Sequence, residues 1–351
     1  MDNFTFFAND NNIFEEEVKC KMEKVIEINN LVKKYKEIKA INNLSFAVNK
    51  GEILGLLGPN GSGKSTTINC ILSLLKYDSG SIEIFGKKMN IKSYDIKSKI
   101  GVIFQDVAVF NELTVYENID YFCGLYIKDK NTRKKCVNDA INLVKLEDFK
   151  KFYPNKLSGG LLRRLNIACG IAHNPKLIFF DEPTVAVDPQ SRNNILEGIK
   201  KLRDNGATIV YTTHYMEEVE ILCDRVIILD KGKIIAEGSP KDLKKMSKIK
   251  EVISVDINNL EEKEIKELEN LDDVDSVKYN EGTLNIKFKK DNNLISVIKY
   301  FEKNNLQYDK IDVKKPTLND VFLELTGKEL RDWCFFTILN IHLKFYLEIN
   351  Y

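Results

Sequence analysis

Short apolar runs alternate with amphipathic stretches over the first two thirds of the chain. The first two runs, Val25–Leu31 and Ala40–Val48, predict a pair of antiparallel strands. Later strand-like runs are Ile53–Leu57, Leu177–Phe180, Thr208–Tyr211 and Val226–Leu229. Helical spacing of apolar residues marks Thr66–Leu75, Val115–Leu125, Arg133–Val144 and Leu161–Ala172. This alternation predicts an α/β domain with a mostly parallel sheet over residues 24–241, in which residues 107–172 are mainly helical.

A second pattern follows a lysine-rich linker predicted at residues 242–250. The elements expected there are strand 252–257, helix 261–269, strand 274–279, strand 283–289, helix 292–303 and strand 307–313. The order βαββαβ is that of a ferredoxin-like fold. We therefore expect a small accessory domain over residues 251–328.

Both ends of the chain differ from these two regions. Residues 1–23 lack the basic start and apolar centre of a secretion signal. We expect either that this segment is a disordered extension or that the start codon is misassigned and translation begins at Met22. The tail, 329–351, contains an aromatic and apolar stretch that is too short to cross a bilayer. We expect this tail to be poorly ordered and dispensable, with packing onto the accessory domain as an alternative and an interfacial helix as the least favoured one.

Composition limits the classes of function. Hydrophobic residues make up 43% and charged residues 30% of the 351 residues, as in ordinary globular proteins. The net charge of +1 provides no general attraction for nucleic acid. The seven cysteines form no CxxC pair, which argues against a disulfide scaffold or zinc site. No apolar stretch reaches the ~18–20 residues of a membrane span, so any role at a membrane requires a partner.

A glycine-rich motif follows the predicted strand Ile53–Leu57 and precedes a predicted helix. Its residues are Gly58, Pro59, Asn60, Gly61, Ser62, Gly63, Lys64 and Ser65, followed by Thr66. The spacing GxxxxGK[ST] is that of a phosphate-binding loop, in which backbone N–H groups and a helix N-terminus face an anion. Lys64 is suited to the β- and γ-phosphates and Ser65 to Mg²⁺.

Two further groups fit nucleotide hydrolysis. Asp181 and Glu182 end the buried run Leu177–Phe180, where Asp181 is a candidate Mg²⁺ ligand and Glu182 a candidate general base. Ser158, Gly159 and Gly160 begin a predicted helix. From the residues alone, this LSGG segment is either a second anion site or a simple helix cap at Ser158.

Taken in order, these motifs resemble those of the ATP-binding-cassette (ABC) ATPases. The resemblance implies that Ser158, Gly159 and Gly160 bind the γ-phosphate of ATP held by an opposite subunit. It also implies four single-residue roles: Tyr35 stacks on adenine, Gln105 links Mg²⁺ and the attacking water to the helical subdomain, Asp188 crosses between subunits, and His214 contacts the γ-phosphate. The chain departs from the usual pattern at Leu161 and Leu162 after the glycines and at Ala186 before Val187.

The stretch Thr317–Gly327 and the small C-terminal region resemble the drug- and polysaccharide-export ATPases. The resemblance implies an ATP- and Mg²⁺-dependent ATPase that forms a dimer around two ATPs. It would lie at the cytoplasmic face of the membrane, bound to a separate permease that contacts the transported substrate. Two alternatives remain: an importer subunit, or an ABC ATPase acting on ribosomes or DNA. The second is disfavoured by the single phosphate loop and the near-zero net charge.

Overall fold

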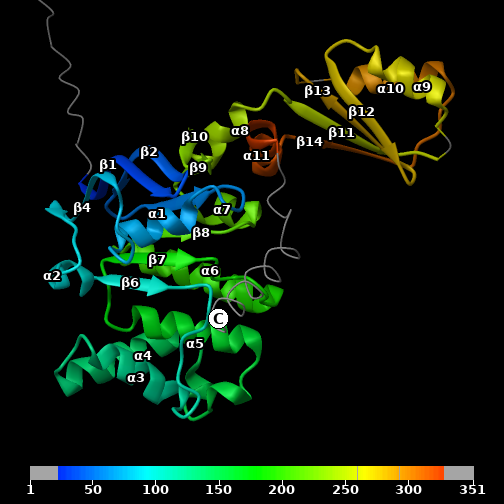
Figure 1. Cartoon of the computed structure of the whole chain (residues 1–351). Coiled ribbons are helices and arrows are strands. Elements are labelled where there is room, and N and C mark those ends of the chain that lie inside the picture. Colours follow the sequence, from blue (N-terminus) through cyan, green and yellow to red (C-terminus); the bar gives the residue numbers. More distant parts are fainter. Residues whose placement is uncertain (1–22, 259, 292, 328–351) are drawn as a thin grey trace, which may run out of the picture.

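The computed structural model describes residues 23–258, 260–291 and 293–327. Within these ranges the chain builds three sheets together with the helices that pack against them (Figure 1). The predicted termini, 1–23 and 329–351, lie outside the described residues except for Glu23. Among the described helices, none is both long enough and apolar enough to cross a bilayer.

The first sheet is antiparallel and holds the predicted N-terminal strand pair. Its order is β2 (Ile38–Asn49), β1 (Lys24–Tyr35), β4 (Ser79–Ile84) and β5 (Lys87–Lys88). The two N-terminal strands are therefore confirmed, whereas β4 carries only two buried apolar residues and was not predicted. A short helix, α2 (Tyr94–Lys97), follows this sheet.

The second sheet forms the centre of the larger body. Its order is β10 (Lys233–Gly238), β9 (Arg225–Asp230), β3 (Ile53–Leu57), β8 (Thr208–Thr212), β7 (Leu177–Asp181) and β6 (Ile100–Ile103). All neighbours are parallel except β10, which turns back against β9 as a hairpin. All five residues of β3 are buried, since layers cover both faces of this strand. Ile53 and Leu57 join one hydrophobic core, and Leu54 and Leu56 join the other.

Beyond α2, the helices of the larger body include the four that the sequence predicts and three, beginning at Pro189, Met216 and Pro240, that it does not. They are α1 (Lys64–Ile71), α3 (Val115–Gly124), α4 (Lys130–Leu143), α5 (Gly159–Ile171), α6 (Pro189–Asp204), α7 (Met216–Leu222) and α8 (Pro240–Lys245), with short 3₁₀ turns at Glu147–Phe149 and Pro154–Lys156. Polar side chains mark several starts: Thr114 and Glu117 form a reciprocal capping box at α3. Residues 242–245, expected in a linker, continue α8 instead.

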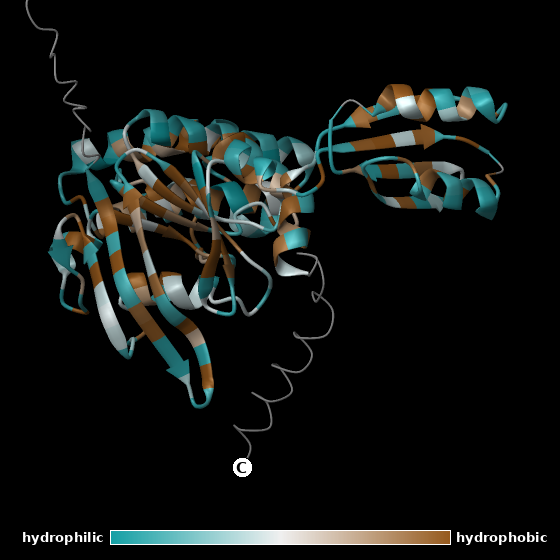
Figure 2. Cartoon of the chain, turned by 90° about the horizontal axis from the view of Figure 1, so that it is seen from above, coloured by the Kyte–Doolittle hydropathy of each residue, from teal (hydrophilic) through white to brown (hydrophobic). Residues whose placement is uncertain are grey.

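The third sheet stands to one side of the larger body together with α9 (Glu262–Glu269) and α10 (Leu294–Lys303) (Figure 2). Its order is β12 (Val274–Asn280), β13 (Thr283–Phe288), β11 (Glu251–Asp256) and β14 (Lys310–Lys314), and every neighbouring pair is antiparallel. A separate hydrophobic core fills the space between this sheet and its helices, with Phe288 and Phe301 fully buried.

The last described helix, α11 (Leu318–Thr326), returns from the third sheet to the larger body. Leu318 and Phe322 are fully buried in the core that also contains residues of α7 and α8. Glu220 on α7 accepts a hydrogen bond from the backbone N–H of Leu318 at 3.1 Å. The end of the expected accessory domain therefore packs on the first domain.

Candidate nucleotide site

The glycine-rich loop connects β3 to α1 in a conformation that only small residues allow. Gly63 has φ of 107°, and a Cβ there would lie 2.5 Å from the carbonyl oxygen of Ala40 on β2. A side chain is excluded by both conditions. The β1–β2 hairpin thus lies directly against the loop, and Tyr35, with an exposed ring, sits at the end of β1 on the same hairpin.

Lys64 folds back over this loop. Its Nζ donates hydrogen bonds to the carbonyl oxygens of Gly58 (2.6 Å) and Pro59 (3.2 Å). Burial lowers the pKa of Lys64, while the charges of Glu182 and Asp181 oppose that shift. Ser62 Oγ, beneath the loop, is buried without a hydrogen-bond partner among the described residues. Ser65 is exposed and Thr66 half-buried at the start of α1.

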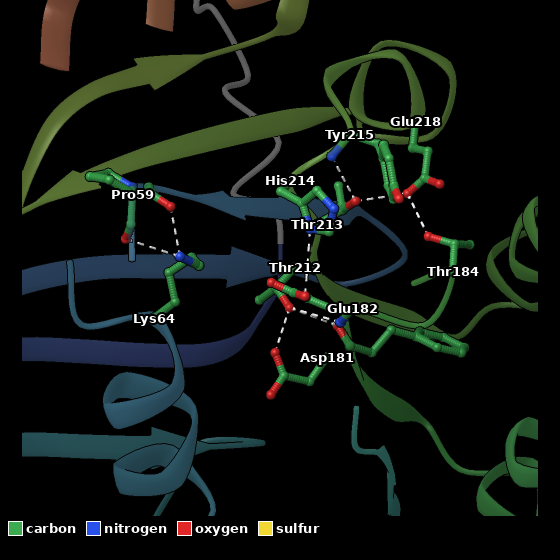
Figure 3. A network of polar contacts seen from close by, with 12 residues as sticks. Pro59, Lys64, Asp181, Glu182, Thr184, Thr212, Thr213, His214, Tyr215 and Glu218 are labelled. Atoms are coloured by element: carbon green, nitrogen blue, oxygen red, sulfur yellow. Dashed lines mark hydrogen bonds and ion pairs between the residues drawn. The ribbon is translucent and has the colours of Figure 1, made fainter. Parts of the chain in front are cut away.

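The carboxylates at the end of β7 are held by the neighbouring strand β8 (Figure 3). Thr212 Oγ1 donates to Asp181 Oδ1 at 2.6 Å and accepts from the backbone N–H of Glu182 at 3.1 Å. Glu182 adopts φ of 49°, in the left-handed region, which turns the chain sharply after the strand. The hydroxyl of Thr212 therefore fixes both acidic residues, a role that sequence reasoning missed.

The two adjacent carboxyl groups differ in their electrostatic environment. Burial raises the pKa of Asp181, and the hydrogen bond from Thr212 only partly offsets this effect. The contact with His214, whose Nδ1 lies 3.5 Å from Glu182 Oε2, lowers the pKa of Glu182 against the effect of burial. Such a divergence is typical of paired acids with different chemical tasks. Lys64, Asp181, Glu182 and His214 thus share one electrostatic site.

A second group of predicted residues lies together elsewhere on the larger body. Ser158 caps α5, since its Oγ accepts from the N–H of Leu161 at 3.4 Å, and both Ser158 and Gly159 are exposed. Gly160 packs so closely on the Asp188 loop that a Cβ would lie 2.7 Å from Asp188 Oδ2. Asp188 caps α6 by accepting from the N–H of Ser191 at 2.8 Å, which lowers its pKa.

Among the described residues, these two groups make no direct polar contact with each other: no hydrogen bond or ion pair links the Ser158 and Asp188 group to Lys64, Asp181 or Glu182. The exposed LSGG glycine and serine are left facing outward.

Gln105 follows β6 and is exposed. Its carbonyl oxygen accepts from Arg163 Nη1 at 2.5 Å, and Asn166 Oδ1 accepts from the N–H of Ala108 at 3.1 Å. Both side chains that bond this loop, the donor Arg163 and the acceptor Asn166, lie on α5, the helix that Ser158 caps. Sequence reasoning missed Arg163 and Asn166, because polar residues on a helix normally indicate a solvated face, yet both are buried here.

Comparison with known families gives a consistent result. A family model described as ABC transporter matches residues 41–185, and one described as ATP-binding protein DrrA1-3-like, C-terminal domain, matches residues 238–326. The linearmycin resistance ATP-binding protein LnrL of Bacillus subtilis is 36% identical over 88% of this chain and 100% of its own length. The chain belongs to the ABC transporter ATP-binding family.

Other relatives agree with this assignment. The Nod factor export ATP-binding protein I of Sinorhizobium fredii is 32% identical over 90% of this chain and 89% of that protein. The daunorubicin resistance ATP-binding protein DrrA3 of Streptomyces coeruleorubidus is 28% identical over 87% of this chain and 97% of that protein.

A solved structure of the cassette MJ0796, dimeric and bound to ADP and Pi, matches 61% of this chain and 98% of that chain with TM-score 0.56 and 31% identity. As an ABC ATPase, this chain binds ATP and couples its hydrolysis to transport.

Proposed function

We propose that two copies of this chain close around two ATP molecules and drive export through a separate permease. The observation that carries the proposal is that no hydrogen bond or ion pair in the described part of the chain joins the Lys64 group to the exposed Ser158 and its Asp188 group, which we treat as two half-sites. In a twofold dimer, a residue of one copy that contacts a residue of the other does so twice, once in each direction. If Ser158 of one copy reaches the phosphates held by Lys64 of the other, the same contact therefore forms at both sites. The names of the relatives, which concern Nod factor export and drug resistance, support export.

In this proposal each residue of the first half-site has one task. The loop from Gly58 to Thr66 holds the phosphates, and Lys64 exchanges its neutral carbonyl partners for charged phosphate oxygens, which are stronger acceptors. Glu182 accepts a proton from the attacking water, and His214 orients Glu182 and the γ-phosphate. Tyr35 stacks on adenine.

The residues of the second half-site act on the partner's nucleotide. Ser158, Gly159 and Gly160 contribute a hydroxyl, two N–H groups and the N-terminal end of α5 toward a γ-phosphate. Asp188 extends across the interface. Gln105, tied to α5 through Arg163, transmits the state of the site to the helical subdomain and the permease.

The donor set suits Mg²⁺. The Ser65 hydroxyl, the Asp181 carboxylate and the Gln105 amide are hard oxygen ligands, and Mg²⁺ typically takes one or two protein oxygens together with phosphate and water. Among the described residues, no cluster of three or more His, Cys, Asp or Glu would hold a metal alone, so these ligands rely on the nucleotide to complete the sphere. The ion would neutralise phosphate charge.

We also propose a domain division that follows the packing. Residues 24–245 together with α11 form the cassette, with the helical subdomain at 107–172, and residues 251–314 form an accessory domain of the ferredoxin-like class. The βαββαβ order and the antiparallel sheet β12-β13-β11-β14 support that class. The assembly lies at the cytoplasmic face of the membrane, bound to its permease.

Dimer formation tests the proposal. Glu182→Gln should bind ATP without efficient hydrolysis and elute as a dimer with ATP, and adding Ser158→Arg should return it to a monomer that still binds ATP through Lys64. A matched control, Ser98→Arg, changes an exposed serine outside both half-sites and should leave the dimer intact. Light scattering with bound nucleotide counted per chain measures both results. An ATP-bound monomer in Glu182→Gln alone would contradict the proposal.

A further inference from the structure

Glu218 on α7 is a buried acid that the roles above do not use. Its side chain is 2% exposed. One carboxylate oxygen, Oε2, accepts hydrogen bonds from three hydroxyl groups: Thr184 Oγ1 at 3.0 Å, Tyr211 at 2.8 Å and Thr213 Oγ1 at 2.8 Å (Figure 3). Three such charge-assisted bonds on one buried oxygen fix the donors firmly in place.

The three donors come from the segments that carry the proposed reacting side chains. Thr184 lies two residues after Glu182, and Tyr211 and Thr213 flank the end of β8 just before His214. The Thr213 hydroxyl also accepts from the backbone N–H of Tyr215 at 3.0 Å. Glu218 therefore fixes the backbone on both sides of His214 and the turn after Glu182 at the same time.

The other oxygen of the carboxylate faces a third segment of the site. Glu218 Oε1 lies 3.5 Å from Arg192 Nε, on the first turn of the helix that Asp188 caps. The Arg192 guanidinium lies 4.2 Å from the centre of the Tyr215 ring, which in turn lies 4.2 Å from the His214 ring. Arg192 Nε and Glu218 Oε1 form no hydrogen bond in the described part of the chain, so this contact is a looser ion pair than the three hydroxyl bonds.

We propose that Glu218 is a positioning residue for ATP hydrolysis, which holds the His214 loop and the turn after Glu182 in register with the Asp188 helix. The inference rests on the proposed roles of Glu182 and His214. It predicts that a change at Glu218 slows the chemical step and leaves ATP binding intact, because none of its partners belongs to the phosphate loop.

Glu218→Gln tests the inference, since it keeps the shape of the side chain. The neutral amide accepts more weakly from the three hydroxyls and directs an N–H donor at Arg192. We expect kcat to fall by about 10- to 100-fold, the scale of small misplacements of reacting groups, with the Kd for ATP within about twofold. Glu217→Gln is the matched control, because Glu217 is an exposed acid on the same turn. Its kcat should equal that of the wild type.

Combination with His214→Ala separates positioning from a general loss of structure. Two of the three donors to Glu218, Tyr211 and Thr213, lead to His214. Glu218→Gln should therefore slow single-turnover hydrolysis by a clearly smaller factor in the His214→Ala background than in the wild type. A full multiplicative loss in the double variant would overturn the inference. If His214→Ala alone leaves hydrolysis unchanged, the proposed role of His214 fails instead, which is a distinct result.

Thr184→Val provides a milder variant, should Glu218→Gln fold poorly. It removes one of the three hydroxyl donors and preserves the side-chain volume. We expect kcat to fall about 3- to 10-fold with unchanged Kd for ATP. Unchanged kcat in a folded Glu218→Gln or Thr184→Val variant contradicts the inference.

Discussion

Glu182 Oε2 lies 3.5 Å from Nδ1 of His214, and the contact lowers the pKa of Glu182. The two residues are brought together because β7 and β8 are neighbouring parallel strands that end at the same edge of the sheet. An ionised carboxylate that stays ionised at neutral pH is what a general base requires.

Replacement of this carboxylate should separate binding from hydrolysis. Glu182→Gln is expected to retain ATP binding and to lose ~10²-fold or more in kcat, the scale of general acid–base catalysis. Steady-state ATPase measurements beside equilibrium ATP binding check both quantities. Turnover near that of the wild type would show that another group takes the proton.

The same contact predicts a pH dependence of stability. Because the pKa of Glu182 is lower in the folded protein than its ordinary value of 4.5, the contact stabilises the fold above about pH 4.5. The stabilisation is lost as the pH falls through the lower, folded value. The difference in melting temperature between wild type and Glu182→Gln, without nucleotide, should therefore shrink on acidification below pH 4.5; a difference that grows would have the wrong sign.

The pKa shift of Asp181 has the opposite effect on the pH dependence of stability. Burial raises its pKa, so its charged form costs stability at neutral pH, and protonation relieves that cost as the pH falls. Asp181→Asn still accepts from Thr212 and removes the buried charge. We expect a higher melting temperature, by about 2–4 °C if the gain is about 1 kcal/mol, together with loss of Mg²⁺-dependent ATPase activity. A lower melting temperature in differential scanning calorimetry would contradict this reading.

Two fully buried phenylalanines in the C-terminal region belong to different cores. Phe322 of α11 packs in the cassette, and Phe301 of α10 packs in the third sheet's core. Phe322→Ala should destabilise the cassette by about 3–5 kcal/mol, the usual cost of such a cavity. Phe301→Ala should leave ATPase activity at 25 °C unchanged while its own region melts earlier. If the ATPase activity of both variants were lost at the same lowered temperature, the assignment of the two phenylalanines to separate domains would be refuted.

This packing also changes one expectation from the sequence. A separate accessory domain over residues 251–328, as the sequence predicts, implies that a chain cut near Lys245 keeps nucleotide binding. Such a cut also removes α11, whose Leu318 and Phe322 fill the cassette core. We now expect the cut chain to bind ATP but to unfold at a lower temperature than a chain in which only 250–314 is replaced by a short linker.

The sequence was informative where local chemistry determines structure. The glycine loop and the acidic end of β7 follow from turn residues and buried runs that leave few alternatives. The packing of segments that are distant in the sequence could not be predicted. Leu318 and Phe322 mark an amphipathic helix without indicating which core receives it.

The buried polar partners were equally hidden. Glu217, Glu218 and Glu220 form one acidic run on a short helix, and only the structure distinguishes the buried member from the exposed ones. The sequence analysis assigned no role to Arg163, whose guanidinium holds the Gln105 loop. Such contacts depend on which elements meet, which a single sequence does not specify.

Mixing two inactive variants tests the central claim, that each ATP site is shared between two copies. Lys64→Ala disables the phosphate loop and Ser158→Arg disables the LSGG segment, so each alone should form no complete site. Each mixed dimer has one complete site, which is half the number of sites in a wild-type dimer. We predict that ATPase activity reappears at up to that level only on mixing. No recovery in mixtures shown by native mass spectrometry to contain mixed dimers, or full activity of either variant alone, would contradict the account.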